Sequence, residues 1–166
     1  LSAVCAAVGA ALVIRSLAGE RVVGMDEFHR GPYETAVGPA EMLVEIRVPT
    51  PARAGSAYQK VDRRVGDWAV VAAGAAVQLE GGTIARAGIA LAAVGGEITA
   101  RAAEASLAGA EPTEEHFARA ARLAASACEP VTDQRGSADY KRHVVGVLTE
   151  RVLRRATERA QQMREV

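Results

Sequence analysis

Two glycine-containing turns divide residues 58–94 into three extended segments, and this pattern constrains the fold more than any other feature of the chain. The turns lie at Gly66-Asp67 and at Glu80-Gly81-Gly82. The segments that they separate, residues 58–63, 68–79 and 83–94, alternate in polarity or are rich in small and β-branched residues, as strands are. Consecutive strands joined by tight turns pair antiparallel. The sequence therefore predicts a three-stranded antiparallel meander.

Helical patterns follow the third strand. Residues 100–108 predict a short helix, Thr113 is placed to cap a second helix that ends near residue 127, and Ser137 is placed to cap a long final helix. Residues 72–76 are all alanine or glycine, which would let a helix approach the sheet closely. The predicted fold class is α+β, with a three-stranded antiparallel sheet packed against about three helices.

Residues 1–50 carry a separate pattern. Small apolar residues before Gly9 predict the end of a helix, residues 12–23 a hairpin, and residues 42–48 a strand, after a loop punctuated by glycine and proline. Residues 49–56 have the composition of a linker, so we expect two units, 1–50 and 51–166. Because the chain begins at Leu1 within a helical pattern, we expect it to be a piece of a longer polypeptide.

Charge and cysteine content narrow the function classes. With 20 basic and 20 acidic residues the formal net charge is zero, so no overall field attracts nucleic acid or an anionic membrane. The longest apolar run near the start, residues 3–14, is too short to span a bilayer. Cys5 and Cys128 are far apart without C-x-x-C spacing, which favours buried thiols in a reducing compartment over a disulfide or a zinc site.

Standard catalytic motifs are absent from the sequence. It contains no G-x-S-x-G, H-E-x-x-H, Walker or dinucleotide-binding fingerprint. The three histidines, His29, His116 and His143, have no partner at metal-ligand spacing. A free-standing small-molecule enzyme is therefore the least favoured class, and we predict neither catalytic residues nor metal ligands.

Basic and aromatic residues converge around the first turn of the predicted meander. Lys60, Arg63 and Arg64 precede the turn, and Trp68, the only tryptophan, follows it. These cations are typical of a solvated strand edge. A lysine close to an aromatic ring also suits a planar cofactor that gains electron density on reduction. The residues alone leave both interpretations open.

Four motifs in order resemble the C-terminal portion of the FAD-binding medium subunit of molybdenum hydroxylases, the carbon monoxide dehydrogenase and xanthine dehydrogenase family. The resemblance covers essentially the whole chain. Its motifs are GPYET at 31–35, EMLVEIRVP at 41–49, YQK at 58–60 followed by RRVGDWA at 63–69, and DQRGSADYKRH at 133–143.

This resemblance implies a division of the chain and three cofactor-binding residues. Residues 1–50 would be the C-terminal remnant of an FAD-binding domain, and residues 51–166 the flavoprotein C-terminal domain. Leu43 resembles a leucine packed near the flavin, and Lys60 resembles a flavin-contacting lysine. Trp68 stands where the family places a tyrosine or another residue beside the isoalloxazine, so that a phenolic hydroxyl is replaced by a larger ring.

The implied function is that of an FAD-dependent oxidoreductase subunit in the cytoplasm, passing electrons from iron-sulfur clusters through FAD to an external acceptor. The implied partners are an iron-sulfur subunit, a molybdenum-cofactor subunit and the missing N-terminal segment of the FAD domain. The family holds the FAD diphosphate with glycine-rich loops earlier in the subunit. We therefore expect these residues alone to be inactive and not to retain FAD. The alternative is a non-catalytic docking domain that assembles the flavin subunit with those partners.

Overall fold

An antiparallel sheet covered by helices forms the larger part of the structure, a computed structural model that describes residues 1–31 and 33–163. The strands are β6 (Ala54–Val61), β7 (Val71–Glu80) and β8 (Thr83–Ala92), in the order β6-β7-β8. Both pairs are antiparallel, and β7 and β8 are joined at Gly81-Gly82. The predicted meander and the α+β class are confirmed.

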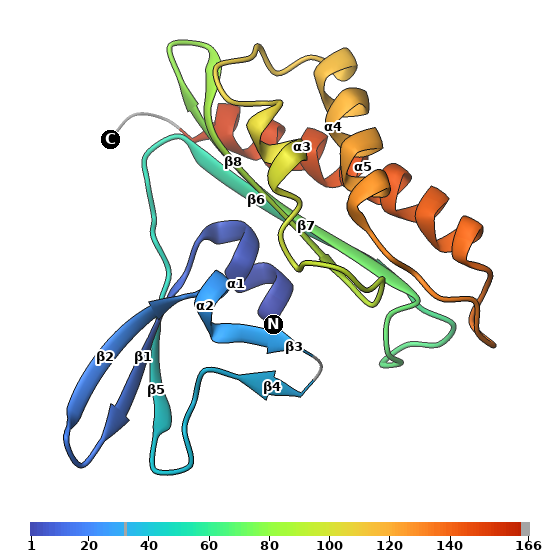
Figure 1. The fold of residues 1–166 in the computed structure, drawn as a ribbon. Coiled ribbons are helices and arrows are strands. Elements are labelled where there is room, and N and C mark those ends of the chain that lie inside the picture. The colour runs from blue at the N-terminus through green and yellow to red at the C-terminus, as the bar shows by residue number, and fades with distance from the viewer. Residues whose placement is uncertain (32, 164–166) are drawn as a thin grey trace.

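Three helices follow the sheet: α3 (Arg101–Ala105), α4 (Glu114–Ala127) and α5 (Ala138–Gln162). As predicted, the two long helices begin at side-chain caps, since the hydroxyl oxygens of Thr113 and Ser137 accept hydrogen bonds from the backbone N–H groups of His116 and Tyr140. The three helices lie on one side of the sheet (Figure 1). Their apolar residues form one core with alternate residues of β7, which include Val71, Ala73, Ala75 and Val77.

Strand β6 begins at Ala54, so the predicted start at Tyr58 was wrong. Gly55 explains the difference, because α5 crosses the strand at this residue. A Cβ on Gly55 would overlap the carbonyl oxygen of Ala156 and lie 2.5 Å from the backbone nitrogen of Ala160. Residues 49–56, which have the composition of a linker, therefore include the start of a strand, and the glycine in it lets a helix approach closely.

The second strand also begins later than predicted, at Val71 instead of Trp68. The backbone N–H of Val70 donates to the carbonyl oxygen of Val61 at 2.7 Å and closes a loop over residues 62–70. The turn at Gly66, where φ is 83°, lies inside this loop. Trp68 therefore belongs to the loop and not to the sheet.

The N-terminal residues form a second, smaller sheet. Helix α1 (Ser2–Val8) ends at Gly9, as predicted, and is followed by β1 (Ala11–Ser16), β2 (Gly19–Gly24) and α2 (Met25–Phe28). Strand β5 (Met42–Arg47) pairs with β1, giving the order β2-β1-β5. Within the predicted loop, β3 (His29–Gly31) and β4 (Glu34–Thr35) pair as a short ribbon. Pro32 of the GPYET motif lies outside the described residues.

Helix α1 packs against the face of the larger sheet that α4 and α5 leave free (Figure 1). A Cβ on Gly88 of β8 would overlap the carbonyl oxygen of Ala7, and one on Gly74 of β7 would lie 3.7 Å from that of Ala3. The small residues of β7 therefore admit a helix, as predicted, and Gly88 extends this close approach to β8. On β6, Tyr58 and Lys60 of the same face remain exposed.

No helix within residues 1–31 and 33–163 combines the length and the apolar character that crossing a membrane requires.

Candidate functional site

Lys60 lies on the uncovered face of β6. Side chains alternate along a strand, so Tyr58 and Lys60 project away from the helix-facing Ala57, which is buried. The Lys60 Nζ atom lies 2.8 Å from the carboxylate of Asp62 and donates to the carbonyl oxygen of Asp67 at 2.9 Å. An ammonium group carries three N–H donors, so these two partners leave one donor for a further acceptor.

The backbone of Trp68 is linked to Lys60 through Asp67. The carbonyl oxygen of Asp67 accepts from Lys60, and its carboxylate accepts from the backbone N–H of Trp68 at 2.8 Å. Trp68 is 68% exposed. An exposed aromatic side chain thus follows directly after the residue that binds Lys60, and its open surface suits contact with a planar ligand.

Leu43, the third predicted cofactor residue, lies in the other sheet. It pairs with Ile14 of β1 and packs against the N-terminal core. The described contacts join Lys60 to the Trp68 loop, but they do not join Leu43 to either residue. Its contact with a flavin stays a prediction.

A cavity of about 770 Å³ opens between the N-terminal part and the larger sheet. Tyr58 lines it and lies two residues from Lys60 on the same face of β6. None of Leu43, Lys60 and Trp68 lines this cavity. The other lining residues come from the start of α1, from the α2–β3 region, and from the end of β8 through the following segment to the start of α3; they include Leu1, Arg30, Ala93, Gly96 and Arg101.

The sequence analysis does not predict this cavity, although two adjacent glycines, Gly95 and Gly96, follow the third predicted strand. The backbone at Ala93, Gly95 and Gly96 has φ angles of 67°, 65° and 71°. A Cβ on Gly95 would overlap the carbonyl oxygen of Glu129, which explains the glycine there. The adjacent glycines were the available signal, but their partner Glu129 is distant in sequence.

The charge at the rim of this cavity is locally balanced. Arg101 lies 2.9 Å from the carboxylate of Asp26 and 3.5 Å from that of Glu97. The hydrogen bond to Asp26, with help from its charge, raises the pKa of the Arg101 guanidinium. This cation is therefore already paired.

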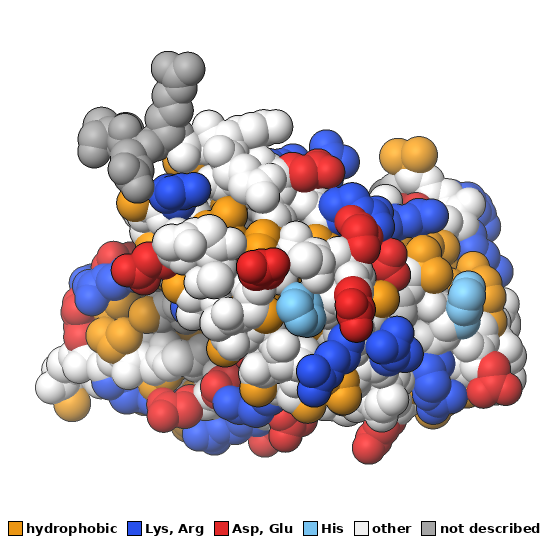
Figure 2. Space-filling view, turned by 90° about the horizontal axis from the view of Figure 1, so that it is seen from above, with side chains coloured by type: hydrophobic (Ala, Val, Ile, Leu, Met, Phe, Trp, Pro, Cys, Tyr) orange, Lys and Arg blue, Asp and Glu red, His pale blue; other side chains and the backbone are white. Residues whose placement is uncertain are grey.

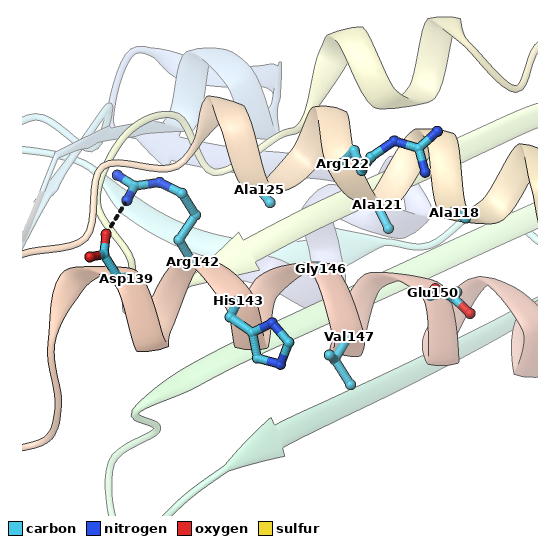
Figure 3. A pocket seen from close by; sticks show the side chains of 10 residues that line it. All are labelled: Ala118, Ala121, Arg122, Ala125, Asp139, Arg142, His143, Gly146, Val147 and Glu150. Carbon is cyan, nitrogen blue, oxygen red and sulfur yellow. Dashed lines mark hydrogen bonds and ion pairs between the residues drawn. The ribbon is translucent and has the colours of Figure 1, made fainter.

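A second cavity, of about 480 Å³, lies between α4 and α5 (Figure 3). Small side chains of α4 lie opposite Gly146 of α5, and charged residues border the cavity. One of these, Arg142, is paired with Asp139 of its own helix at 3.3 Å. Figure 2 shows acidic and basic side chains interspersed over the face seen from above, as the zero net charge would suggest.

Among residues 1–31 and 33–163, no three His, Cys, Asp or Glu side chains come together as a metal site. Cys5 and Cys128 are free and buried, as predicted. Burial raises the pKa of the Cys128 thiol, which keeps it protonated near neutral pH.

Residues 56–156 match the family model of the CO dehydrogenase flavoprotein C-terminal domain. The chain belongs to this family. Residues 1–51 match a second model, the FAD binding domain in molybdopterin dehydrogenase. The family recognised from the four sequence motifs is therefore confirmed, and FAD is the cofactor of this flavoprotein family.

Relatives of this flavoprotein family include two carbon monoxide dehydrogenase medium chains. The one from Hydrogenophaga pseudoflava is 38% identical over 92% of this chain and 54% of its own length. The one from Afipia carboxidovorans is 34% identical, with the same two coverages. The chain thus spans about half the length of these relatives.

Solved structures of the family have the same fold. Carbon monoxide dehydrogenase from Hydrogenophaga pseudoflava, in a form lacking the Mo-pyranopterin moiety, superposes with a TM-score of 0.88 at 40% identity, over 95% of this chain and 56% of the other. Quinoline 2-oxidoreductase from Pseudomonas putida 86 superposes with a TM-score of 0.82 at 35% identity, over 96% and 56%.

Proposed function

We propose that this chain is the C-terminal portion of the flavoprotein subunit of a molybdenum hydroxylase-type dehydrogenase. In the complete complex, electrons would pass from iron-sulfur clusters through FAD to an external acceptor. The observation that carries this proposal is the pairing of Lys60 with the exposed Trp68 loop on the uncovered face of β6. Membership of the family supports it independently.

FAD, when bound, supplies a ring system that accepts and releases electrons. Lys60 holds a positive charge at the edge of that site, and Asp62 and Asp67 fix the position of its ammonium group. Trp68 covers one face of the site with its indole. Arg63 and Arg64, exposed on the same loop, orient the loop or meet a partner.

The residues present fit one half of an FAD site. A lysine with a donor to spare and an exposed indole can contact the edge and the face of a planar ring. The sequence contains no glycine-rich loop of the kind that cradles a diphosphate. FAD held by these residues alone would lack its phosphate contacts, so we expect weak retention.

The remaining assignments belong to the same proposal. Leu43 would approach the flavin from the N-terminal part, and the chain would divide into residues 1–50, from an FAD-binding domain, and 51–166. The partners would be an iron-sulfur subunit, a molybdenum-cofactor subunit and the rest of the FAD domain. The free thiols Cys5 and Cys128 support a reducing compartment, the cytoplasm.

Replacing Trp68 tests the proposed site. In the complete subunit, Trp68→Ala should raise the FAD dissociation constant about 3- to 10-fold, because an aromatic stacking contact contributes about that much. Val65→Ala, a fully exposed apolar residue of the same loop, is the matched control and should bind FAD normally. The measurement is a titration of the apoprotein with FAD. Equal affinity of Trp68→Ala and wild type would remove Trp68 from the site.

The second candidate function is docking of the flavin subunit onto its partner subunits. The cavity between α4 and α5, a surface groove, favours it. Its small side chains leave room for a partner segment, and the exposed Arg122 stands at its border. If partner subunits dock here, Arg122→Glu should reduce their co-purification with the flavin subunit. Arg119→Glu, on the same helix but outside the groove, should leave it unchanged. Full assembly of the Arg122→Glu variant would exclude this groove as the docking surface.

A further inference from the structure

The segment between α4 and α5 is fixed by a buried lysine. Lys141, on the first turn of α5, is only 3% exposed. Its Nζ atom donates to the carbonyl oxygen of Val131 at 2.8 Å and lies 2.8 Å from the carboxylate of Asp133. A buried ammonium needs both a counter-charge and hydrogen-bond acceptors, so this lysine holds the segment to the helix start.

Asp133, held by Lys141, in turn fixes the backbone of Arg135. Its carboxylate accepts a hydrogen bond from the backbone N–H of Arg135 at 2.8 Å. The backbones of Asp133 and Gly136 also exchange two hydrogen bonds of 3.1 Å, closing a tight turn around Gln134 and Arg135. Together these bonds fix the backbone from which the Arg135 side chain extends.

The guanidinium of Arg135 reaches the loop that carries Trp68. It donates to the carbonyl oxygen of Ala69 at 3.4 Å, across 66 positions of sequence. We propose that Arg135, oriented by the Asp133–Lys141 ion pair, is a positioning residue for the loop of residues 62–70. The DQRGSADYKRH motif thereby acquires a role that the flavin site alone does not give it.

Arg135 holds the side of this loop that follows the indole. Lys60 binds the loop at Asp67, and Val70 binds it back to Val61 at its base. Ala69 lies between these anchors, directly after Trp68, and is held by Arg135. Losing this bond frees the backbone next to the indole without touching Lys60. The consequence for flavin binding rests on the function proposed for Trp68, whereas the positioning of the loop does not.

Hydrogen exchange in the absence of FAD tests this inference. The Val70 amide is protected by its bond to Val61 and exchanges when the loop opens. Removing one hydrogen bond with Arg135→Ala should raise its exchange rate about two- to fivefold. Arg142→Ala is the matched control, because the ion pair of Arg142 lies within α5, with Asp139. It should leave the Val70 rate unchanged.

A second variant tests the ion pair. Asp133→Asn combined with Lys141→Met removes both charges, so that neither charge is left buried without its partner. It should raise the Val70 exchange rate in the same direction as Arg135→Ala, with α4 amides unaffected. A wild-type rate in either variant, or an equal rise in Arg142→Ala, would overturn the inference. Because no flavin is present, this outcome is separate from any failure of the proposed FAD site.

Discussion

The Gly55→Ala variant is expected to lose about 3 kcal/mol of unfolding free energy, the upper part of the range for overpacked sites. The added methyl group would overlap the carbonyl oxygen of Ala156 and meet the backbone nitrogen of Ala160 at 2.5 Å. Both are backbone atoms of α5, so no side-chain rotation relieves the overlap. Helix α5 would have to move away from β6 and expose part of the larger core.

Chemical denaturation of the purified protein measures this loss. Gly24→Ala is the matched control, because Gly24 has an extended backbone (φ −77°, ψ 166°) and a methyl group added there would meet no atom within 4 Å. Its unfolding free energy should stay within about 0.5 kcal/mol of wild type. A Gly55→Ala variant as stable as the Gly24→Ala control would show that α5 does not cross β6 at this glycine.

The Lys60→Met variant of the complete, FAD-loaded subunit should have a lower flavin reduction potential. A positive charge beside the ring favours the electron-rich form, so removing it disfavours electron uptake. At an effective dielectric constant near 20, such a charge contributes about 2 to 4 kcal/mol at separations of about 8 to 4 Å, or roughly 40 to 90 mV for two electrons. We expect a shift near the smaller end of this range, because the carboxylate of Asp62 partly offsets the charge of Lys60.

A redox titration of the bound flavin measures this shift. Arg63→Met also removes one positive charge, but from an exposed position on the same loop, where solvent screens it. Its potential should stay near that of wild type. Equal potentials for Lys60→Met and Arg63→Met would mean that Lys60 acts only as one more surface charge.

Local signals in the sequence were sufficient to predict the caps and the turns. Thr113 and Ser137 cap helices with their own side chains, and Gly81 and Gly82 turn the chain between neighbouring strands. Each of these features depends only on residues that are close together in the sequence. The three-stranded sheet followed from the same signals because its strands are consecutive.

The parts of the fold that were not predicted depend on contacts between distant residues. Gly55 resembles a linker residue until Ala156 of α5 is placed against it. Trp68 follows a turn, but the bond from Val70 to Val61 keeps it out of the strand. The packing of α1 on β8 depends on Gly88 and Ala7, which belong to different sequence patterns.

The candidate site likewise has parts that the sequence predicts and parts that depend on contacts between distant residues. Lys60 and Trp68 are close in sequence, and the structure joins them through Asp67. Tyr58 was visible in the same motif, but its position in a cavity with the α1 start could not be inferred without the packing of the N-terminal part. The contact from Arg135 to Ala69 likewise could not be predicted, because the two residues are 66 positions apart in the sequence.

A crystal structure of the complete subunit with FAD would show whether the face of β6 that carries Lys60, together with Trp68, contacts the flavin. We expect the Lys60 Nζ atom within hydrogen-bond distance of the flavin ring, about 3 Å, and the Trp68 ring within about 7 Å of it. A flavin ring bound away from β6, with Lys60 paired only to Asp62 and Asp67, would contradict it.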